Sequence, residues 1–340
     1  MARKKDSAYL QRALMLARKR YLKKPGVVSV GIGFKHSVKN GYSGKAKCCI
    51  KFLVDKKRNV KSKKSKLPRT VQFTEKGKRH RFPTDVIELG VVSQQSGAYE
   101  YLPYVGKSQK VQGGTPGYLV FNRADPDDIY LVTAGHIFKG VTNRIPVFLN
   151  KAEIGALDTQ TLNIRTNHAL LDLAVVKISN KDFTLENLAS MPWTSLSETV
   201  PETEMETLEY WELYGQPKHF IIAGRKNYVR AEMDSYFDKG NGAFKLRLKS
   251  GKIIHYRPPL VAYRFKHMAE TSPGDSGAPV ILEGENGEQK SLIGHHVFHA
   301  KSQPSNEKNM GYAVPAFSVA SALKTELGAD VELMTIQLGH

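Results

Sequence analysis

The apolar positions at the start of the chain recur every three or four residues, as on one face of a helix. Asp6 or Ser7 can cap this helix, and Pro25-Gly26 ends it. The repeat consists of Leu10, Leu14, Ala17 and Tyr21. Apolar runs typical of strands follow at residues 27–34, 46–54, 70–73 and 82–88. The pattern predicts a small α+β domain over residues 1–90, and the polar residues 91–112 predict a connector.

The pattern changes at about residue 113. Short apolar runs, each about four to eight residues long, alternate with turn residues and predict an all-β sandwich or a pair of barrels. A helical pattern returns only at residues 316–327 and ends at Gly328. We therefore expect one mainly β domain over residues 113–340, closed by a C-terminal helix. Its strand-like runs are residues 117–121, 129–132, 147–149, 173–178, 220–223, 244–248, 252–256, 278–282, 292–298 and 311–314.

Charge separates the same two parts. The 340 residues carry a net charge of +19, yet residues 1–82 alone hold 26 Lys/Arg against 3 Asp/Glu. The rest of the chain keeps 25 of the 51 basic residues and 29 of the 32 acidic ones, so it is nearly neutral. The basic stretch 56–69 is too polar to be buried. This excess predicts a docking surface for nucleic acid, an acidic protein or an anionic membrane, or else a solvated lysine-rich face. Because no nucleic-acid motif is present, any such binding should be independent of sequence and sensitive to salt.

Several classes of protein are disfavoured. No apolar run approaches the roughly 20 residues that span a bilayer, and the charged start does not look like a secretory signal. Cys48 and Cys49 are adjacent and cannot staple distant parts of the fold. On a strand their side chains point to opposite faces, so one belongs to the core and one to the surface. We expect a cytoplasmic protein with neither cofactor nor metal.

Three short motifs carry candidate chemistry. The first, residues 131–136, runs from a strand into a small-residue turn that ends at His136. The second places Asp172 within an apolar strand, and the third holds Ser276 in the glycine-flanked turn Gly-Asp-Ser-Gly. A serine hydroxyl needs an imidazole to accept its proton, and the imidazole needs a buried acceptor that fixes its tautomer. Each residue alone has an ordinary structural explanation, but their order on a β-rich chain favours a catalytic triad.

These motifs, Thr-Ala-Gly-His, Asp-Leu-Ala-Val and Gly-Asp-Ser-Gly-Ala-Pro-Val, resemble the three active-site blocks of chymotrypsin/trypsin-like serine proteases. The resemblance implies two packed six-stranded β-barrels with a C-terminal helix. It also implies His136 as general base, Asp172 as its orienting partner and Ser276 as nucleophile, with the backbone N–H groups of Gly274 and Ser276 as oxyanion hole. The barrels lack cysteine and no Ile-Val-Gly-Gly site precedes them, so Asp275 needs a partner other than a newly cleaved N-terminus.

The N-terminal part is similar to the domain that precedes the protease in a group of prokaryotic and plant trypsin-like proteins, which includes the plant narrow-leaf proteins. The resemblance implies an intracellular protease. The similar segments are residues 31–35, 50–52, 67–68, 83–86 and the entry into the first barrel at 113–120.

The resemblance also places a specificity pocket. Its floor falls at Glu270 and Thr271, and one wall is the strand that contains Gly294-His295-His296. A Gly-x-His pattern with Thr five residues before the serine is similar to the glutamyl endopeptidases, so His296 and Thr271 imply cleavage after Glu or Gln, which we favour. Glu270 instead favours Lys or Arg, unless it points to solvent or pairs with His295.

The leading hypothesis is therefore a serine endopeptidase regulated by a partner or substrate that docks on the basic N-terminal domain. One alternative is a catalytically idle trypsin-like fold that acts as a binding module. Another is a nucleic-acid-docking protein that binds through its basic region.

Overall fold

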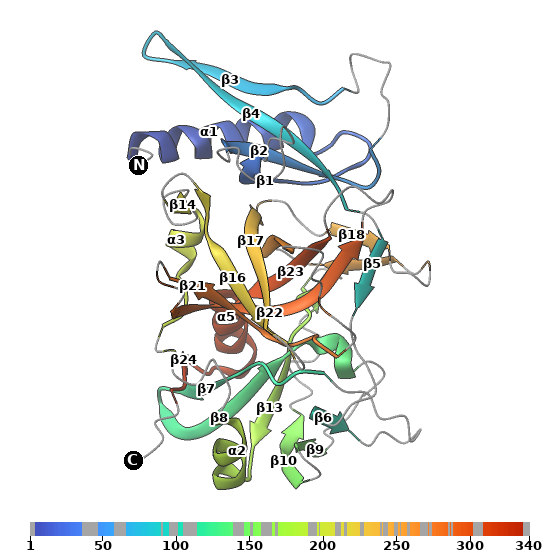
Figure 1. The fold of residues 1–340 in the computed structure, drawn as a ribbon, viewed down its shortest axis with the longest axis vertical. Helices are drawn as coiled ribbons and strands as arrows, with labels where there is room; N and C mark the ends of the chain where they lie inside the picture. Colours follow the sequence, from blue (N-terminus) through green and yellow to red (C-terminus); the bar gives the residue numbers. More distant parts are fainter. Residues whose placement is uncertain are drawn as a thin grey trace.

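The computed structural model is mainly β, as the sequence predicts (Figure 1). The residues that it describes are 4–35, 47–57, 66–89, 91–94, 101–104, 114–138, 146–149, 152–157, 165–166, 169–189, 196, 198–207, 212–213, 216–224, 228–238, 240, 244–247, 251, 253–256, 259–265, 271, 274–284, 286, 288–301 and 309–335.

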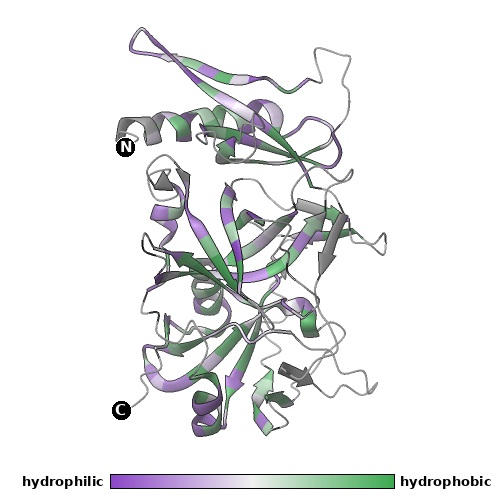
Figure 2. Cartoon of the chain, viewed as in Figure 1, coloured by the Kyte–Doolittle hydropathy of each residue, from purple (hydrophilic) through white to green (hydrophobic). Residues whose placement is uncertain are grey.

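The N-terminal part contains the predicted helix and four strands, but the helix begins at Lys4, before the predicted caps Asp6 and Ser7. The elements are α1 (Lys4–Tyr21), β1 (Val27–Lys35), β2 (Lys47–Val54), β3 (Thr70–Glu75) and β4 (Lys78–Glu88). The helix packs on the sheet through a buried stripe, because Leu10, Ala13, Leu14 and Ala17 are all 2% exposed or less. Hydrophilic residues alternate with hydrophobic ones along α1 and on the β3–β4 hairpin (Figure 2).

The second part of the chain begins with a seven-stranded sheet of order β24-β7-β8-β13-β10-β9-β6. Among the described residues, its first and last strands, β24 and β6, do not pair with each other. The connector prediction for residues 91–112 missed two strands, because β5 (Val91–Gln94) pairs with β22 and β6 pairs with β9. The strands of the sheet are β6 (Tyr101–Tyr104), β7 (Tyr118–Asn122), β8 (Asp125–Thr133), β9 (Pro146–Leu149), β10 (Ala152–Leu157), β13 (Ala174–Ile178) and β24 (Val331–Leu333).

Six strands form the predicted closed barrel. The order is β16-β21-β22-β23-β20-β17, and the pairing of β16 with β17 closes the ring. These strands are β16 (His219–Ala223), β17 (Tyr228–Phe237), β20 (Leu260–Phe265), β21 (Pro279–Glu283), β22 (Gln289–Lys301) and β23 (Met310–Pro315). The C-terminal helix α5 (Ala316–Leu327) follows β23 directly and ends at Gly328, as predicted.

Shorter elements connect and flank the two sheets. They are η1 (Gly135–Phe138), β11 (Arg165–Thr166), β12 (Ala169–Leu170), α2 (Lys181–Leu188), α3 (Glu202–Met205), β14 (Glu212–Leu213), β15 (Gln216–Pro217), β18 (Phe244–Arg247) and β19 (Ile253–Tyr256). In the described part of the chain, no helix is both long enough and apolar enough to cross a bilayer.

The N-terminal strands continue the sheet of the barrel. Strand β1 pairs with β17 through Ile32 opposite Tyr236 and Gly33 opposite Ser235. A charged network crosses this junction: the Nζ of Lys51 on β2 lies 2.9 Å from Asp85 Oδ2 and 3.2 Å from Asp234 Oδ1. Asp234 Oδ1 also accepts a hydrogen bond of 2.6 Å from Arg264 on β20. In addition, apolar side chains from α1, β1 and β2 share one hydrophobic core with the barrel.

The two cysteines face opposite sides of β2, as the strand alternation predicts. Cys49 is fully buried, whereas Cys48 is partly exposed, and neither forms a disulfide. Burial raises the pKa of the Cys49 thiol to about 12, opposed by the positive charge of Lys51. A thiol with so high a pKa is a poor nucleophile, which disfavours redox chemistry at Cys49.

Candidate active site

His136 is held on the one-turn helix η1 that follows β8. The turn requires glycine at position 135, because a Cβ there would lie 2.8 to 3.0 Å from backbone atoms of Leu173. This close approach brings the turn against the residues that precede β13. Asp172 lies there, two residues before the strand and not within it as the sequence predicts. The small residues of the Thr-Ala-Gly-His motif thus set the position of the imidazole.

Asp172 is fully buried and adopts a left-handed backbone with φ of 52°. A residue other than glycine is rare in this conformation, so surrounding bonds must hold it. Its Oδ1 accepts the backbone N–H of His136 at 2.8 Å. Its backbone carbonyl accepts a hydrogen bond from His295 Nε2 at 3.1 Å.

Ser276 lies in a tight turn whose backbone is held by hydrogen bonds from Thr115, which lies just before β7. The N–H of Thr115 donates to the carbonyl of Ser276 at 2.9 Å, and the Thr115 hydroxyl donates to the carbonyl of Gly274 at 2.8 Å. Gly277 has φ of +93°, and a Cβ there would lie 2.1 Å from Thr133 Oγ1. The turn therefore tolerates only glycine after the serine.

The three candidate residues meet in the structure. His136 Nδ1 lies 2.9 Å from Asp172 Oδ2 and 3.1 Å from Oδ1, and His136 Nε2 lies 2.7 Å from Ser276 Oγ. With the proton on Nδ1 bonded to the carboxylate, Nε2 offers its lone pair to the serine hydroxyl. All three residues are buried, with His136 7% exposed and the other two 0%. This arrangement can deprotonate the hydroxyl and stabilise the imidazolium that results.

A second histidine lies behind the carboxylate. His295 on β22 is fully buried, and its Nδ1 has no hydrogen-bond partner among the described atoms. Burial lowers the pKa of His295 to about 4, although its bond to the Asp172 carbonyl acts in the opposite direction. The ring is therefore neutral near pH 7 and keeps its proton on Nε2, where it supports the strained backbone of Asp172.

Two of the residues predicted for the specificity pocket lie together. The hydroxyl of Thr271 is 3.2 Å from His296 Nε2, and the hydroxyl of Tyr263 is 2.5 Å from His296 Nδ1. Both Thr271 and His296 are buried, at 1% and 0% exposure. Burial lowers the pKa of His296 well below its usual value, with further lowering from the nearby histidines. Glu270 falls outside the described residues.

The predicted oxyanion groups lie on the serine turn itself. Gly274 has φ of 103°, and Asp275 beside it is 3% exposed. The Asp275 carboxylate lies against Gly224, where an added Cβ would be 2.8 Å from Asp275 Oδ1. The assignment of the N–H groups of Gly274 and Ser276 to an oxyanion hole stays a prediction.

Sequence reasoning missed three residues that hold the site. Thr115 clamps the serine turn, His295 holds the Asp172 carbonyl, and Tyr263 fixes the ring of His296. Only Thr115 left a signal, since it stands in the small-residue segment before the first strand of the β domain. In the described part of the chain, no cluster of three His, Cys, Asp or Glu side chains could hold a metal ion.

No protein-family model and no curated protein matches the sequence. Among solved structures, the chain is similar to the Rv3671c protease of M. tuberculosis in its active form, with 16% identity, a TM-score of 0.37 and coverage of 67% of this chain and 79% of that one. For an alpha-lytic protease homolog, N4, the identity is 13%, the TM-score 0.36 and the coverage 69% and 95%. For the NS6 protease of murine norovirus 1 the identity is 12%, the TM-score is 0.28, and the coverage is 56% of this chain and 81% of that one.

Proposed function

We propose that this protein is a serine endopeptidase that cleaves proteins through Ser276, His136 and Asp172. The observation that carries the proposal is the hydrogen-bonded chain from Asp172 Oδ2 through His136 to Ser276 Oγ, with steps of 2.9 and 2.7 Å. Hydrogen-bonding distance between nucleophile and base, with a third group orienting the base, is the geometry that activates a serine hydroxyl. An idle binding module would have no need of this alignment.

In the proposed reaction, Ser276 Oγ attacks the carbonyl carbon of the peptide while its proton passes to His136 Nε2. The negative oxygen that forms accepts hydrogen bonds from the N–H groups of Gly274 and Ser276. The C–N bond then breaks, and the leaving amine takes the proton from His136. A water molecule, deprotonated by the same nitrogen, hydrolyses the acyl ester and restores the serine. Asp172 stays ionised throughout and stabilises the positive imidazole.

A fluorophosphonate probe tests this proposal because it reacts with an activated serine hydroxyl and needs no knowledge of the substrate. We expect the wild-type chain to be labelled and Ser276→Ala to be unlabelled. Ser321→Ala on the exposed side of α5 is the matched control and should label like wild type. Labelling that persists in Ser276→Ala would overturn the assignment of the nucleophile. Absence of labelling from the folded wild-type chain would favour the idle binding module.

The finer proposal is cleavage after Gln or Glu, with Gln preferred. Burial raises the pKa of the Tyr263 phenol well above its usual value, so Tyr263 keeps its proton and donates to His296 Nδ1. The proton of the neutral His296 ring then lies on Nε2. A neutral N–H donor suits the carbonyl of an amide side chain, whereas a carboxylate would have to raise the pKa of the buried ring. A Lys or Arg side chain of a substrate would find no counterion at Thr271 or His296.

We also propose that a negatively charged partner or substrate, an acidic protein or a nucleic acid, docks on the N-terminal part. Exposed cations lie on the turn and strands of the β3–β4 hairpin, at Lys76, Lys78, Arg79 and Arg81. Further exposed cations lie on α1 at Arg12, Lys19 and Arg20. Such a surface attracts polyanions over the range of a Debye length.

A further inference from the structure

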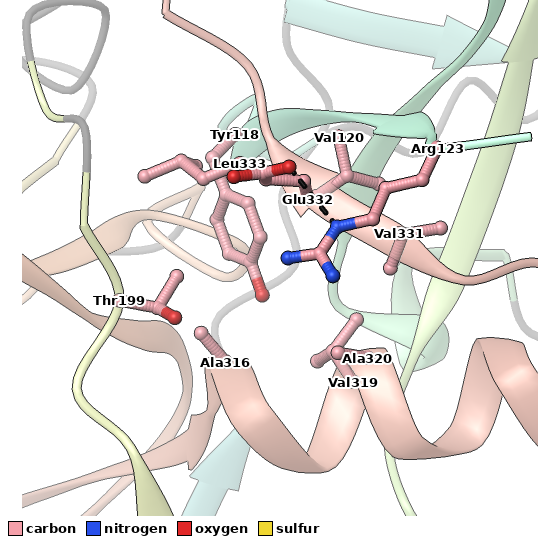
Figure 3. A pocket seen from close by; sticks show the side chains of 10 residues that line it. All are labelled: Tyr118, Val120, Arg123, Thr199, Ala316, Val319, Ala320, Val331, Glu332 and Leu333. Carbon is pink, nitrogen blue, oxygen red and sulfur yellow. Dashed lines mark hydrogen bonds and ion pairs between the residues drawn. The ribbon is translucent and has the colours of Figure 1, made fainter. Parts of the chain in front are cut away.

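A small cavity lies where the seven-stranded sheet meets the helix that follows the barrel (Figure 3). Its volume is about 150 Å³. One wall comes from β7 and β24, which pair through Val120 opposite Leu333. The N-terminal half of α5 forms the facing wall. The lining side chains shown in Figure 3 are mostly aliphatic, except Tyr118, Arg123, Thr199 and Glu332.

Tyr118 supplies an unused hydrogen-bond donor to this cavity. Its side chain is 1% exposed, and its hydroxyl has no partner among the described atoms. Burial raises the pKa of the phenol far above its usual value, so the proton stays on the oxygen. Figure 3 shows the hydroxyl pointing between Ala316 and Thr199, toward the start of α5. Leaving a buried hydroxyl unpaired is unfavourable, so an acceptor in the cavity would stabilise the protein.

The charges at the cavity decide which acceptor suits it. Arg123 Nε donates to Glu332 Oε2 at 3.0 Å, and its guanidinium also lies 3.8 Å from Asp330. Lys324 Nζ lies 3.5 Å from the other carboxylate oxygen of Asp330, so these two cations are already paired with two carboxylates. They offer no excess positive charge to a negatively charged ligand, whereas a neutral hydroxyl or carbonyl group needs no counterion. The volume matches that of an apolar protein cavity that holds one benzene ring.

We propose that this cavity is a binding site for a small neutral molecule, of the size of one aromatic ring, that carries one hydroxyl or carbonyl group toward Tyr118. The apolar body of the ligand contacts Val120, Val319 and Leu333. Its polar oxygen accepts the hydrogen bond of the Tyr118 hydroxyl.

The site is linked to the candidate triad through Tyr118 and His295. The rings of Tyr118 and His295 have their centroids 6.5 Å apart, and His295 holds the carbonyl of Asp172. A ligand that moves Tyr118 therefore acts one side chain away from the support of Asp172. This coupling depends on the proposed protease function, whereas the binding itself does not.

Phenol is the probe, and its binding to the full chain is measured by ligand-observed NMR and by thermal unfolding. We expect saturable binding with millimolar affinity and a rise of the unfolding temperature. Tyr118→Phe should weaken phenol binding about 2- to 10-fold, the range for one neutral hydrogen bond, without changing the weaker binding of benzene. Ala320→Phe should fill the cavity from its partly exposed edge and abolish binding of both probes.

Two results would overturn the site: no saturable phenol binding by the folded wild-type chain, or phenol binding unchanged in Ala320→Phe. Benzoate that binds as tightly as phenol would overturn the neutral chemistry of the ligand. Fluorophosphonate labelling in the presence of phenol then tests the coupling. If phenol binds and the labelling rate does not change, the coupling is wrong and the binding site stands. If wild type never labels, only the protease proposal fails.

Discussion

Lys51 and Asp234 form an ion pair in which both side chains are completely excluded from solvent, with 3.2 Å between Nζ and Oδ1. Lys51 belongs to β2 of the N-terminal part, and Asp234 belongs to β17 of the closed barrel. Burial acts to lower the pKa of the Lys51 ammonium, but Asp234, Cys49 and Asp85 outweigh it and the pKa is raised. The positive charge is thus retained in the interior and holds the two parts together.

Replacing Lys51 with Met should destabilise the fold by about 3 kcal/mol or more, because it removes one partner of a buried ion pair and leaves Asp234 in the interior. The free energy of unfolding in urea measures this loss. Lys19→Met, at an exposed position on α1, is the control and should change it by less than about 0.5 kcal/mol. Equal stability of Lys51→Met and wild type would show that the pair contributes nothing.

Ser276→Ala and His136→Ala should each reduce peptide hydrolysis by about 10⁶-fold, because the proposed triad acts as a unit. Asp172→Asn should cost less, about 10⁴-fold. It should lower the melting temperature more than Ser276→Ala does, because Asp172 also binds the backbone of His136. Single-turnover kinetics and calorimetry on the same samples separate the two effects. Residual hydrolysis by Ser276→Ala would place the nucleophile elsewhere.

Acid should destabilise the fold through His295. The unfolded chain takes up a proton at this residue near pH 6.5, whereas the folded chain does so only near pH 4. The contribution of His295 to stability is therefore complete above pH 6.5 and is lost as the pH falls from 6.5 to about 4, by up to about 1.4 kcal/mol per pH unit. Urea unfolding at several pH values measures the slope. His295→Gln keeps a donor for the Asp172 carbonyl and should reduce the slope by about one proton. Identical slopes for wild type and variant would contradict the buried, neutral ring.

A positional peptide library should show cleavage after Gln, with Glu second. Tyr263→Phe removes the donor that fixes the His296 tautomer, so kcat/KM for Gln substrates should fall about 10-fold, the effect of one buried hydrogen bond. The labelling rate with a fluorophosphonate should not change, which separates specificity from the nucleophile. Dominant cleavage after Lys or Arg, unaffected by His296→Ala, would assign specificity to Glu270 instead.

Binding of a polyanion to the N-terminal part should weaken strongly between about 50 and about 200 mM salt, because the Lys and Arg side chains displace counterions from the polyanion when they bind it. Hydrolysis of a small neutral peptide should change little, because such a substrate carries no charge that the basic surface could attract. The double variant Arg79→Glu/Arg81→Glu should weaken binding of poly-glutamate or single-stranded RNA. Lys324→Glu on α5 is the matched control. Equal salt sensitivity of binding and hydrolysis would refute separate sites.

Local patterns predicted most of the elements and the meeting of the three candidate residues. The helix α1, strands β1 to β4 and helix α5 each carry their own periodicity and end signals, so their existence could be read from short windows. Ser276 and His136 could be chosen because flanking small residues mark their turns, whereas Asp172 was chosen as the one carboxylate in an apolar run. Strand β17 was missed because polar and charged residues interrupt its apolar positions.

Long-range pairing could not be predicted. From the sequence alone, Lys51 looks like a surface residue of β2. Its partner Asp234 is 183 positions away in the chain, so no local pattern indicates the pair. His295 was considered only as a partner of Glu270, since no sequence signal indicates a bond to a backbone carbonyl. The seven-stranded order of the first sheet likewise depends on which distant strands meet, such as β24 on β7.

The hydrogen bonding of β1 to β17 means that the N-terminal part is not an interchangeable module. Excising it would uncover the end of β17 at Ser235 and Tyr236, where unpaired N–H and C=O groups invite association with other chains. It would also leave Asp234 at that edge without its lysine. A shortened protein would therefore be prone to aggregate, so the proposed activity has to be tested on the full chain.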